Sequence, residues 1–436
     1  MESTNRILTI CILISLVICS CSRSVKKSSV DFNHKPTEDK IAEIENDTLG
    51  YGKAFPGAGP AVVVQPEHRL SKVNFFIENS GSIKGFVNGS TTYIDVLTDL
   101  ANHPKFIQKS TRKFYYFTSG INNPLRVLDL TQELRPGRFN QGYSDLNNLF
   151  KVALDSTNNN SISILISDGI YDMCPDPTPL NTLRTLGHGL RSIFINKIGK
   201  QNFQTLLIKF KSGFNGLYSP GNCCNSYNIN EERPFYIWIF GSTEIIEDFF
   251  PDDYITNLRG YVNSARFFRY DASNISYNPS SHKLSGRYYP VRDDPYTLRR
   301  VRTGPSGTFQ FSIAVDFSSL PLNEDYIHDT ANYSCSNAFS VVSIDRPTDM
   351  EILTFKDVTH LIVVNKIGNP AGTLSVSILN KGYPWIETTD LENDCNIRGK
   401  EDQTFGFKIL NQGIIDAYQH FNGKKEIDTF IINLNN

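Results

Sequence analysis

The sequence predicts an α/β protein with a doubly wound, mostly parallel sheet, followed by a second, β-rich C-terminal domain. Between residues 70 and 258, short apolar runs alternate with segments in which apolar residues recur every three or four positions. This is the pattern of buried strands alternating with amphipathic helices. Beyond about residue 260, β-rich runs bounded by Pro, Gly, Asn and Ser follow one another, as in an all-β module. We therefore expect an α/β domain over residues 70–258 and a β-rich domain with a C-terminal helix over residues 259–436.

The elements of the α/β domain follow in order along the chain. Buried strands are predicted where apolar runs are short, and helices where the apolar positions share one helical face. The segment 113–130 contains two strand-like runs about Gly-Ile-Asn-Asn and predicts a hairpin. The segment 211–233 has no helical period and predicts an inserted loop or hairpin. The predicted strands are 73–78, 161–167, 204–210 and 234–240, and the predicted helices are 93–101, 144–154 and 181–198.

The β-rich domain is predicted from runs that are shorter and more regularly interrupted. A helical apolar face recurs only near the C-terminus, over residues 405–421, and a final strand follows it. No family pattern is evident in this half of the chain. The predicted strands are 265–271, 308–317, 338–345, 360–366, 373–380 and 427–434.

The N-terminal region resembles the export signal of a bacterial lipoprotein. An apolar run over residues 7–18 is too short to span a bilayer as a helix but has the proportions of a secretory signal core. It leads into Ile-Cys-Ser-Cys, which resembles a lipobox ending at Cys21. The resemblance implies a signal peptide over residues 1–20, acylation of Cys21 and a flexible tether over residues 21–69. The alternative is an ordinary signal peptide with an incidental cysteine.

Residues near Cys21 also bear on location. Surface-exported lipoproteins of the Bacteroidota often carry acidic residues after the lipidated cysteine, whereas this chain has Lys26 and Lys27. The departure favours a lipid anchor in the outer membrane that faces the periplasm. The net charge of −2 over 436 residues provides no bulk positive field, so nucleic acid is not an expected partner.

Five cysteines follow Cys21, an odd number that allows two disulfides and one remaining thiol in an oxidising compartment. We predict a bond from Cys174 to Cys223 or Cys224, and a second from Cys335 to Cys395. A vicinal bond between the adjacent Cys223 and Cys224 is the alternative.

Oxygen-bearing side chains follow the predicted strands of the α/β domain. Glu78, Ser80 and Ser82 lie where the first strand ends, and alternate residues of an extended chain point the same way. Ser144 lies at the start of a predicted helix, and Asp168 follows another strand in Ser-Asp-Gly. In an open α/β sheet, ligands bind at the carboxyl ends of the strands. We expect these five side chains to converge there.

This set of residues resembles the metal-ion-dependent adhesion site of the von Willebrand factor type A domain. The family pattern is Asp-x-Ser-x-Ser after the first strand, a Thr before a helix, and an Asp in a (Ser/Thr)-Asp-Gly turn. Ser80, Ser82 and Asp168 match by residue type, whereas Glu78 replaces the family's Asp and Ser144 replaces its Thr. The resemblance implies a von Willebrand A-like fold and a metal site formed by all five residues.

The expected ion follows from the ligands. Carboxylate and hydroxyl oxygens favour Mg²⁺, or Ca²⁺ or Mn²⁺, over zinc or copper. The extra methylene of Glu78 moves its carboxylate relative to that of an Asp, so a metal-free scaffold is the alternative.

The function expected from these features is a membrane-anchored binding, adhesion or scaffold module that engages a protein partner in the cell envelope. The chain contains no G-x-S-x-G, H-E-x-x-H, P-loop or Rossmann glycine pattern, and its eight histidines are scattered along the sequence. We therefore expect no enzymatic activity, with an envelope hydrolase as the remaining alternative.

Overall fold

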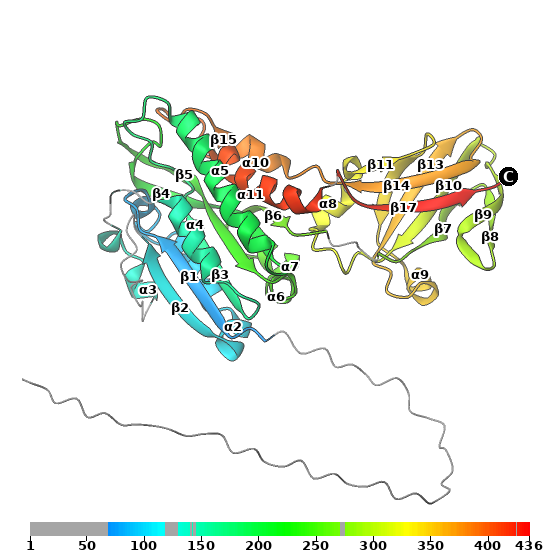
Figure 1. Cartoon of the computed structure of the whole chain (residues 1–436), viewed down its shortest axis with the longest axis horizontal. Coiled ribbons are helices and arrows are strands. Elements are labelled where there is room, and N and C mark those ends of the chain that lie inside the picture. The colour runs from blue at the N-terminus through cyan, green and yellow to red at the C-terminus, as the bar shows by residue number, and fades with distance from the viewer. Residues whose placement is uncertain (1–68, 118–129, 140–141, 143–144, 271–274, 424) are drawn as a thin grey trace, which may run out of the picture. The chain divides into compact units, whose positions relative to one another are not determined.

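A six-stranded mixed sheet forms the centre of the α/β part of the chain (Figure 1). The computed structural model describes residues 69–436 except 118–129, 140–141, 143–144, 271–274 and 424. The strand order is β2-β1-β3-β5-β4-β6, in which β2, β1 and β3 are parallel. The strands are β1 (Lys72–Glu78), β2 (Thr111–Phe117), β3 (Ser161–Ser167), β4 (Gln204–Tyr218), β5 (Tyr227–Gly241) and β6 (Tyr261–Phe267).

Helices cover both faces of this sheet because its strands are apolar on both sides. Successive residues of β1 serve the two layers: Phe75 and Ile77 belong to one hydrophobic cluster and Phe76 to the other. One face carries α1 (Thr92–Ala101), α2 (Pro104–Lys109), α3 (Leu130–Glu133), α6 (Thr243–Phe249) and α7 (Asp252–Thr256), and the opposite face carries α4 (Leu146–Asp155), α5 (Pro179–Ile198) and α11 (Phe407–Asn422).

The predicted α/β class is confirmed, but the prediction of a mostly parallel sheet is wrong. The pairs β3–β5, β5–β4 and β4–β6 are antiparallel. The reason is the segment 211–233, which extends β4 and β5 into one long hairpin instead of supplying a crossover helix. This hairpin inserts β5 beside β3. The second strand predicted within 113–130 lies largely outside the described residues.

A β-sandwich follows the α/β part. Its four-stranded sheet has the order β12-β13-β10-β7 and its five-stranded sheet the order β11-β14-β17-β9-β8. Buried side chains from both sheets form one hydrophobic cluster, which includes Phe311, Val364 and Phe430. The strands are β7 (Tyr277–Ser285), β8 (Arg287–Val291), β9 (Asp294–Arg302), β10 (Thr308–Val315), β11 (Tyr333–Cys335), β12 (Ser340–Asp345), β13 (His360–Ile367), β14 (Gly372–Leu379) and β17 (Glu426–Leu434).

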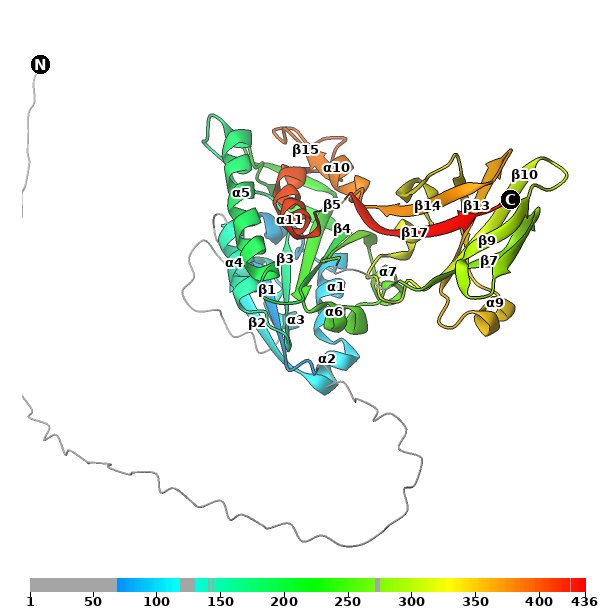
Figure 2. The ribbon, with the colours of Figure 1, turned by 45° about the vertical axis from the view of Figure 1, so that its right-hand side comes forward.

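The sandwich is interrupted by a segment that returns to the α/β part. The predicted C-terminal helix is present as α11, but it packs against α5 and the six-stranded sheet, as Figures 1 and 2 show. The strand predicted at 265–271 is also placed differently, since β6 is the edge strand of the six-stranded sheet. The remaining elements are η1 (Ser82–Gly85), η2 (Pro136–Arg138), α8 (Glu324–His328), η3 (Thr330–Asn332), α9 (Asp349–Thr354), α10 (Pro384–Thr389), β15 (Asp390–Leu391) and β16 (Thr404–Phe405).

Candidate functional site

The carboxyl ends of β1 and β3 carry four of the five predicted site residues, and hydrogen bonds join three of them. Ser80 and Ser82 lie with their hydroxyl oxygens 2.8 Å apart, and Ser82 also hydrogen-bonds the carboxylate of Asp168. A hydroxyl has one proton, so Ser82 donates to Asp168 and accepts from Ser80. Glu78 Oε2 accepts a hydrogen bond of 2.5 Å from Ser167 Oγ. The fifth residue, Ser144, lies outside the described residues.

Parallel pairing explains why the first two segments meet. Ile77 of β1 lies opposite Ile166 of β3, so Glu78 and Ser167 follow at the same edge of the sheet. Ser167 then accepts from the Gly169 backbone N–H at 2.8 Å, and Asp168 Oδ1 accepts from the backbone N–H of Ile170 at 3.2 Å. The Ser-Asp-Gly turn is therefore held by its own side chains.

The loop that carries the two serines is held by the β4–β5 hairpin. Gly85 ends η1, and a Cβ at this position would lie 2.4 Å from the ring of Phe214 in β4. A residue other than glycine cannot occupy Gly85 unless the ring moves, because the phenyl group fills that space. Phe214 of the hairpin therefore packs directly against the loop between β1 and α1.

Burial dominates the electrostatics of the site. Glu78, Ser80 and Asp168 are 1%, 4% and 2% exposed. Burial raises the pKa of Asp168, and the hydrogen bonds from Ser82 and the Ile170 N–H, together with the positive charge of Arg233, act against that rise. A buried carboxylate whose charge is poorly compensated favours either a proton or a nearby cation.

Arg233 is the residue of this site that sequence reasoning missed. It lies on β5, is 1% exposed, and places its guanidinium 4.3 Å from the centre of the Tyr218 ring. Within the described part of the chain, its two terminal nitrogens have no hydrogen-bond partner. An arginine in the segment 211–233 gave no sequence signal, because its proximity to Asp168 depends on the antiparallel pairing of β3 with β5.

Other buried polar atoms near these strand ends also lack partners. Among the described residues, no hydrogen bond is made by Asn79 Oδ1, the Tyr93 hydroxyl or the Tyr116 hydroxyl. The negative charges of Glu78 and Asp168 contribute to the raised pKa of Tyr93, after the larger effect of burial. A buried polar group without a hydrogen-bond partner lowers stability. Three such groups near one set of strand ends therefore favour a functional role for this region.

Two disulfides link chain segments that lie next to the site. Cys174, six residues after Asp168, is bonded to Cys224, and Cys223 is bonded to Cys395. The predicted link from Cys174 to one of the adjacent pair is confirmed. The predicted bond between Cys335 and Cys395 is wrong, because Cys395 lies on the segment that returns to the α/β part; Cys335 is a thiol.

Buried Asp394 forms hydrogen bonds beside the second disulfide. Its carboxylate accepts from the Tyr218 hydroxyl at 2.6 Å and from the backbone N–H of Gly221 at 2.7 Å. The returning segment is thereby attached to the tip of the β4–β5 hairpin, on the same side of the sheet edge as Cys174.

The donor set fits a hard divalent cation. Two carboxylates and two hydroxyls supply oxygen atoms only, the ligands that Mg²⁺, Ca²⁺ and Mn²⁺ prefer. Asn79 Oδ1 is a further buried oxygen that lacks a partner in the described structure. The guanidinium of Arg233 counts against a cation, since it already contributes one positive charge to the region.

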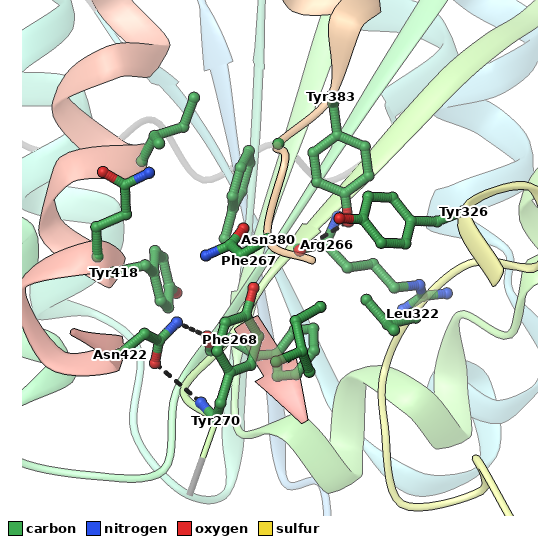
Figure 3. Close-up of a pocket in the computed structure, with 14 residues that line it drawn as sticks. Arg266, Phe267, Phe268, Tyr270, Leu322, Tyr326, Asn380, Tyr383, Tyr418 and Asn422 are labelled. Atoms are coloured by element: carbon green, nitrogen blue, oxygen red, sulfur yellow. Dashed lines mark hydrogen bonds between the residues drawn. The ribbon is translucent and has the colours of Figure 1, made fainter. Parts of the chain in front are cut away.

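A second cavity lies where the α/β part meets the sandwich, and Figure 3 shows its lining. It encloses about 30 Å³, roughly the space of one water molecule. Two of its polar side chains are paired: Tyr383 bonds the backbone N–H and C=O of Arg266, and Asn422 bonds Phe268 and Tyr270. The cavity therefore serves as a packed junction, and the carboxyl edge of the six-stranded sheet is the better candidate site.

Comparisons of the chain with protein-family models, with curated proteins and with solved structures find no match.

Proposed function

We propose that this protein is a lipid-anchored binding module of a bacterial cell envelope, whose α/β part engages a protein partner through a divalent cation. The observation that supports this proposal is the position of four predicted ligands at one edge of the sheet, where Ser80, Ser82 and Asp168 are joined by hydrogen bonds and Glu78 is bonded to the neighbouring Ser167. Two buried carboxylates against one buried guanidinium leave a net charge of −1 when all three groups are ionised. A divalent cation would change that net charge to +1, which one carboxylate of a partner would neutralise.

In this proposal each residue of the chain has a defined role. Glu78 and Asp168 would supply the charged oxygen ligands, and Ser80 and Ser82 the neutral ones. Ser167 orients the Glu78 carboxylate through the 2.5 Å hydrogen bond. A bound Mg²⁺ would supply a Lewis-acidic position for an oxygen ligand, such as a carboxylate of the partner.

Replacing Asp168 by alanine is the direct test. Asp168→Ala should abolish uptake of Mg²⁺ or Mn²⁺ and reduce partner binding with it, because it removes one of two charged ligands. Isothermal titration calorimetry measures the first effect, and a pull-down from envelope extract with and without chelator measures the second. Asp155→Ala is the matched control, since this exposed aspartate at the end of α4 pairs only with Lys151 among the described residues.

Two results would contradict the proposal. Wild-type protein that takes up no Mg²⁺ or Mn²⁺ at millimolar concentration would exclude the cation site. Equal uptake by wild type and Asp168→Ala would place the ion elsewhere. Turnover of ester or phosphate substrates would instead support the hydrolase alternative.

A metal-free scaffold is the second candidate, and Arg233 is the observation that favours it. In a scaffold the guanidinium itself compensates Asp168, so Arg233→Met should lower stability, and Mg²⁺ should have no effect on either protein. In a cation-dependent module, the same substitution should tighten Mg²⁺ binding, because it removes a competing positive charge. Thermal unfolding of both proteins with and without Mg²⁺ separates the two candidates.

The lipid anchor is proposed on sequence alone, since Cys21 lies outside the described residues. In the described part of the chain, no helix has both the length and the apolarity to cross a membrane. Cys21→Ala should shift the protein from the membrane fraction to the soluble fraction, because two or three acyl chains contribute about 0.8 kcal/mol per buried methylene. Unchanged partitioning, together with an N-terminal peptide of wild type that carries no acyl mass, would refute the anchor.

A further inference from the structure

Three side chains of the β-sandwich form a second cluster of possible metal ligands, separate from the carboxyl-edge site. Glu324 and His328 lie one turn apart on α8, and His360 is the first residue of β13. One ligand atom from each of the three lies within 4.8 Å of the others. His360 is 2% exposed, whereas the side chain of His328 is 38% exposed. The Glu-His-His cluster is thus closed on one side and open to solvent on the other.

Hydrogen bonds fix which nitrogen of His328 faces the cluster. Its Nδ1 lies 3.1 Å from the backbone carbonyl oxygen of Ile344. A carbonyl oxygen only accepts, so Nδ1 carries a proton and donates it. Nε2 is the nitrogen that points toward Glu324.

The proton of His360 is also placed on Nδ1, in this case by the hydrogen bonds of the neighbouring Thr359. Its Nδ1 lies 2.9 Å from the hydroxyl of Thr359. That hydroxyl donates its single proton to the carbonyl oxygen of Val315 and accepts from the backbone N–H of Phe317. It can therefore only accept from His360, so Nδ1 of His360 is also a donor. Nδ1–H bonds of this kind to backbone or side-chain oxygens are the usual outer partners of metal-binding histidines.

Both Nε2 atoms face the same oxygen. Nε2 of His360 lies 3.2 Å and Nε2 of His328 lies 3.3 Å from Oε2 of Glu324. Zinc binds nitrogen and oxygen ligands at about 2.0–2.1 Å, which places ligand atoms about 3.3–3.4 Å apart in a tetrahedral shell. Both nitrogen-to-oxygen separations are those that such a shell requires, and the ligand atoms of all three residues lie within 4.8 Å of one another. With its proton on Nδ1 alone, each imidazole has a lone pair on Nε2, so the cluster can offer three electron-pair donors to a cation.

We propose that Glu324, His328 and His360 bind a divalent transition-metal ion of the zinc type, with a fourth position open to solvent. Two imidazoles and one carboxylate form a donor set suited to Zn²⁺, and less to Mg²⁺ or Ca²⁺, which prefer oxygen ligands only. His282 provides a contrast within the same lobe. Its two ring nitrogens face two different carboxylates, those of Asp345 and Glu351, at 3.1 and 3.3 Å, so they do not converge on one oxygen with a second histidine.

Arg346 opposes the ion and provides a sensitive test. Its guanidinium donates to the same Oε2 of Glu324 at 2.6 Å, so the bound ion and the guanidinium share one carboxylate. Arg346→Gln removes a positive charge next to the site and should tighten metal binding several-fold. A cluster that serves only to hold α8 against β13 has no reason to respond in this way.

The experiment is a titration of the untagged, metal-stripped full chain with Co²⁺, followed by displacement with Zn²⁺. Cobalt reports a tetrahedral site through its visible absorption bands. Wild type should bind one Co²⁺ at this cluster and release it to Zn²⁺. His328→Ala should weaken the affinity at least about tenfold. His188→Ala, at an exposed position of α5, is the histidine control and should bind as wild type does.

The outcomes are independent of the carboxyl-edge site. Asp168→Ala should retain the cobalt spectrum, so a failure of one site is distinguishable from a failure of the other. Absence of the tetrahedral Co²⁺ bands in wild type, or equal affinity in His328→Ala and wild type, would overturn the proposal. So would an Arg346→Gln variant that binds Co²⁺ no more tightly than wild type.

Discussion

Replacing Cys395 by serine is expected to lower the free energy of unfolding by several kcal/mol. The Cys223–Cys395 bond joins residues 172 apart in sequence, and a loop of this length corresponds to about 5 kcal/mol of lost chain entropy in the unfolded state. Measured effects of native disulfides fall at about 2–5 kcal/mol. Denaturant unfolding of Cys395→Ser and wild type under non-reducing conditions measures the difference.

Cys335→Ser is the control for that substitution, because Cys335 is not in a disulfide. It should change stability by much less than Cys395→Ser does. Alkylation mapping adds a check on the pairing: in a Cys174→Ser variant, Cys224 should become reactive while Cys223 stays protected. Reactive Cys223 in that variant would show that the two bonds are paired the other way.

Replacing Gly413 by valine is expected to separate α11 from α5 and to cost about 3 kcal/mol or more. A Cβ at Gly413 would lie 2.5 Å from the backbone oxygen of Gly187 on α5. Backbone cannot rotate out of the way as a side chain can, so the helices must move apart. Buried Leu410 and Ile414 of α11 would then lose part of their packing. Thermal or denaturant unfolding of the variant measures the cost.

The direction of the stability change in Gly413→Ala, a smaller substitution, makes this prediction specific. Glycine to alanine inside a helix normally stabilises by about 0.5–1 kcal/mol, whereas Gly413→Ala should destabilise. Gly213→Ala in strand β4 is the control, because glycine costs a similar amount in a strand interior and a Cβ there meets no atom within 4 Å. A Gly413→Ala variant as stable as wild type would mean that α11 does not lie against α5.

The same substitution should also disturb the carboxyl-edge site. Phe407, the first residue of α11, stacks on Tyr236 with ring centres 4.1 Å apart. A Cβ at Gly169 would lie 3.7 Å from the Phe407 ring, so α11 packs against the turn that carries Asp168. Weaker Mg²⁺ uptake by Gly413→Val would tie the C-terminal helix to the proposed site.

Most of the individual elements were predictable because each depends on a local pattern. The four apolar residues of β3 and the helical stripe of α5 depend only on residues close in sequence. Strand pairing does not have this property. The hairpin that places β5 between β3 and β4 joins residues far apart, and no periodicity within the segment 211–233 indicates which strand it will join.

The candidate site divides in the same way. Glu78, Ser80, Ser82 and Asp168 were predicted because they follow strands, and the carboxyl ends of parallel strands meet at one edge. Arg233 was not, because its charge reaches Asp168 only through the antiparallel pairing of β5.

The Glu-His-His cluster combines one contact that the sequence spacing indicates with one that it does not. Glu324 and His328 lie four residues apart, so a helix there puts them on one face, and a reading of that spacing alone would have paired them. His360 reaches them from 32 residues further along the chain, at the start of a strand in another part of the sandwich.

By itself, the sequence determined which segments become strands and helices, and which carboxylates and hydroxyls stand at strand ends. These properties follow from hydrophobic periods of two or about 3.6 residues and from the types of residue that follow each strand. Only the tertiary structure decided the strand order, the partner of Cys395, the return of α11 to the first sheet and the neighbours of Asp168. Each of these depends on contacts between distant residues, whose free energy comes from packing and burial that no local pattern encodes.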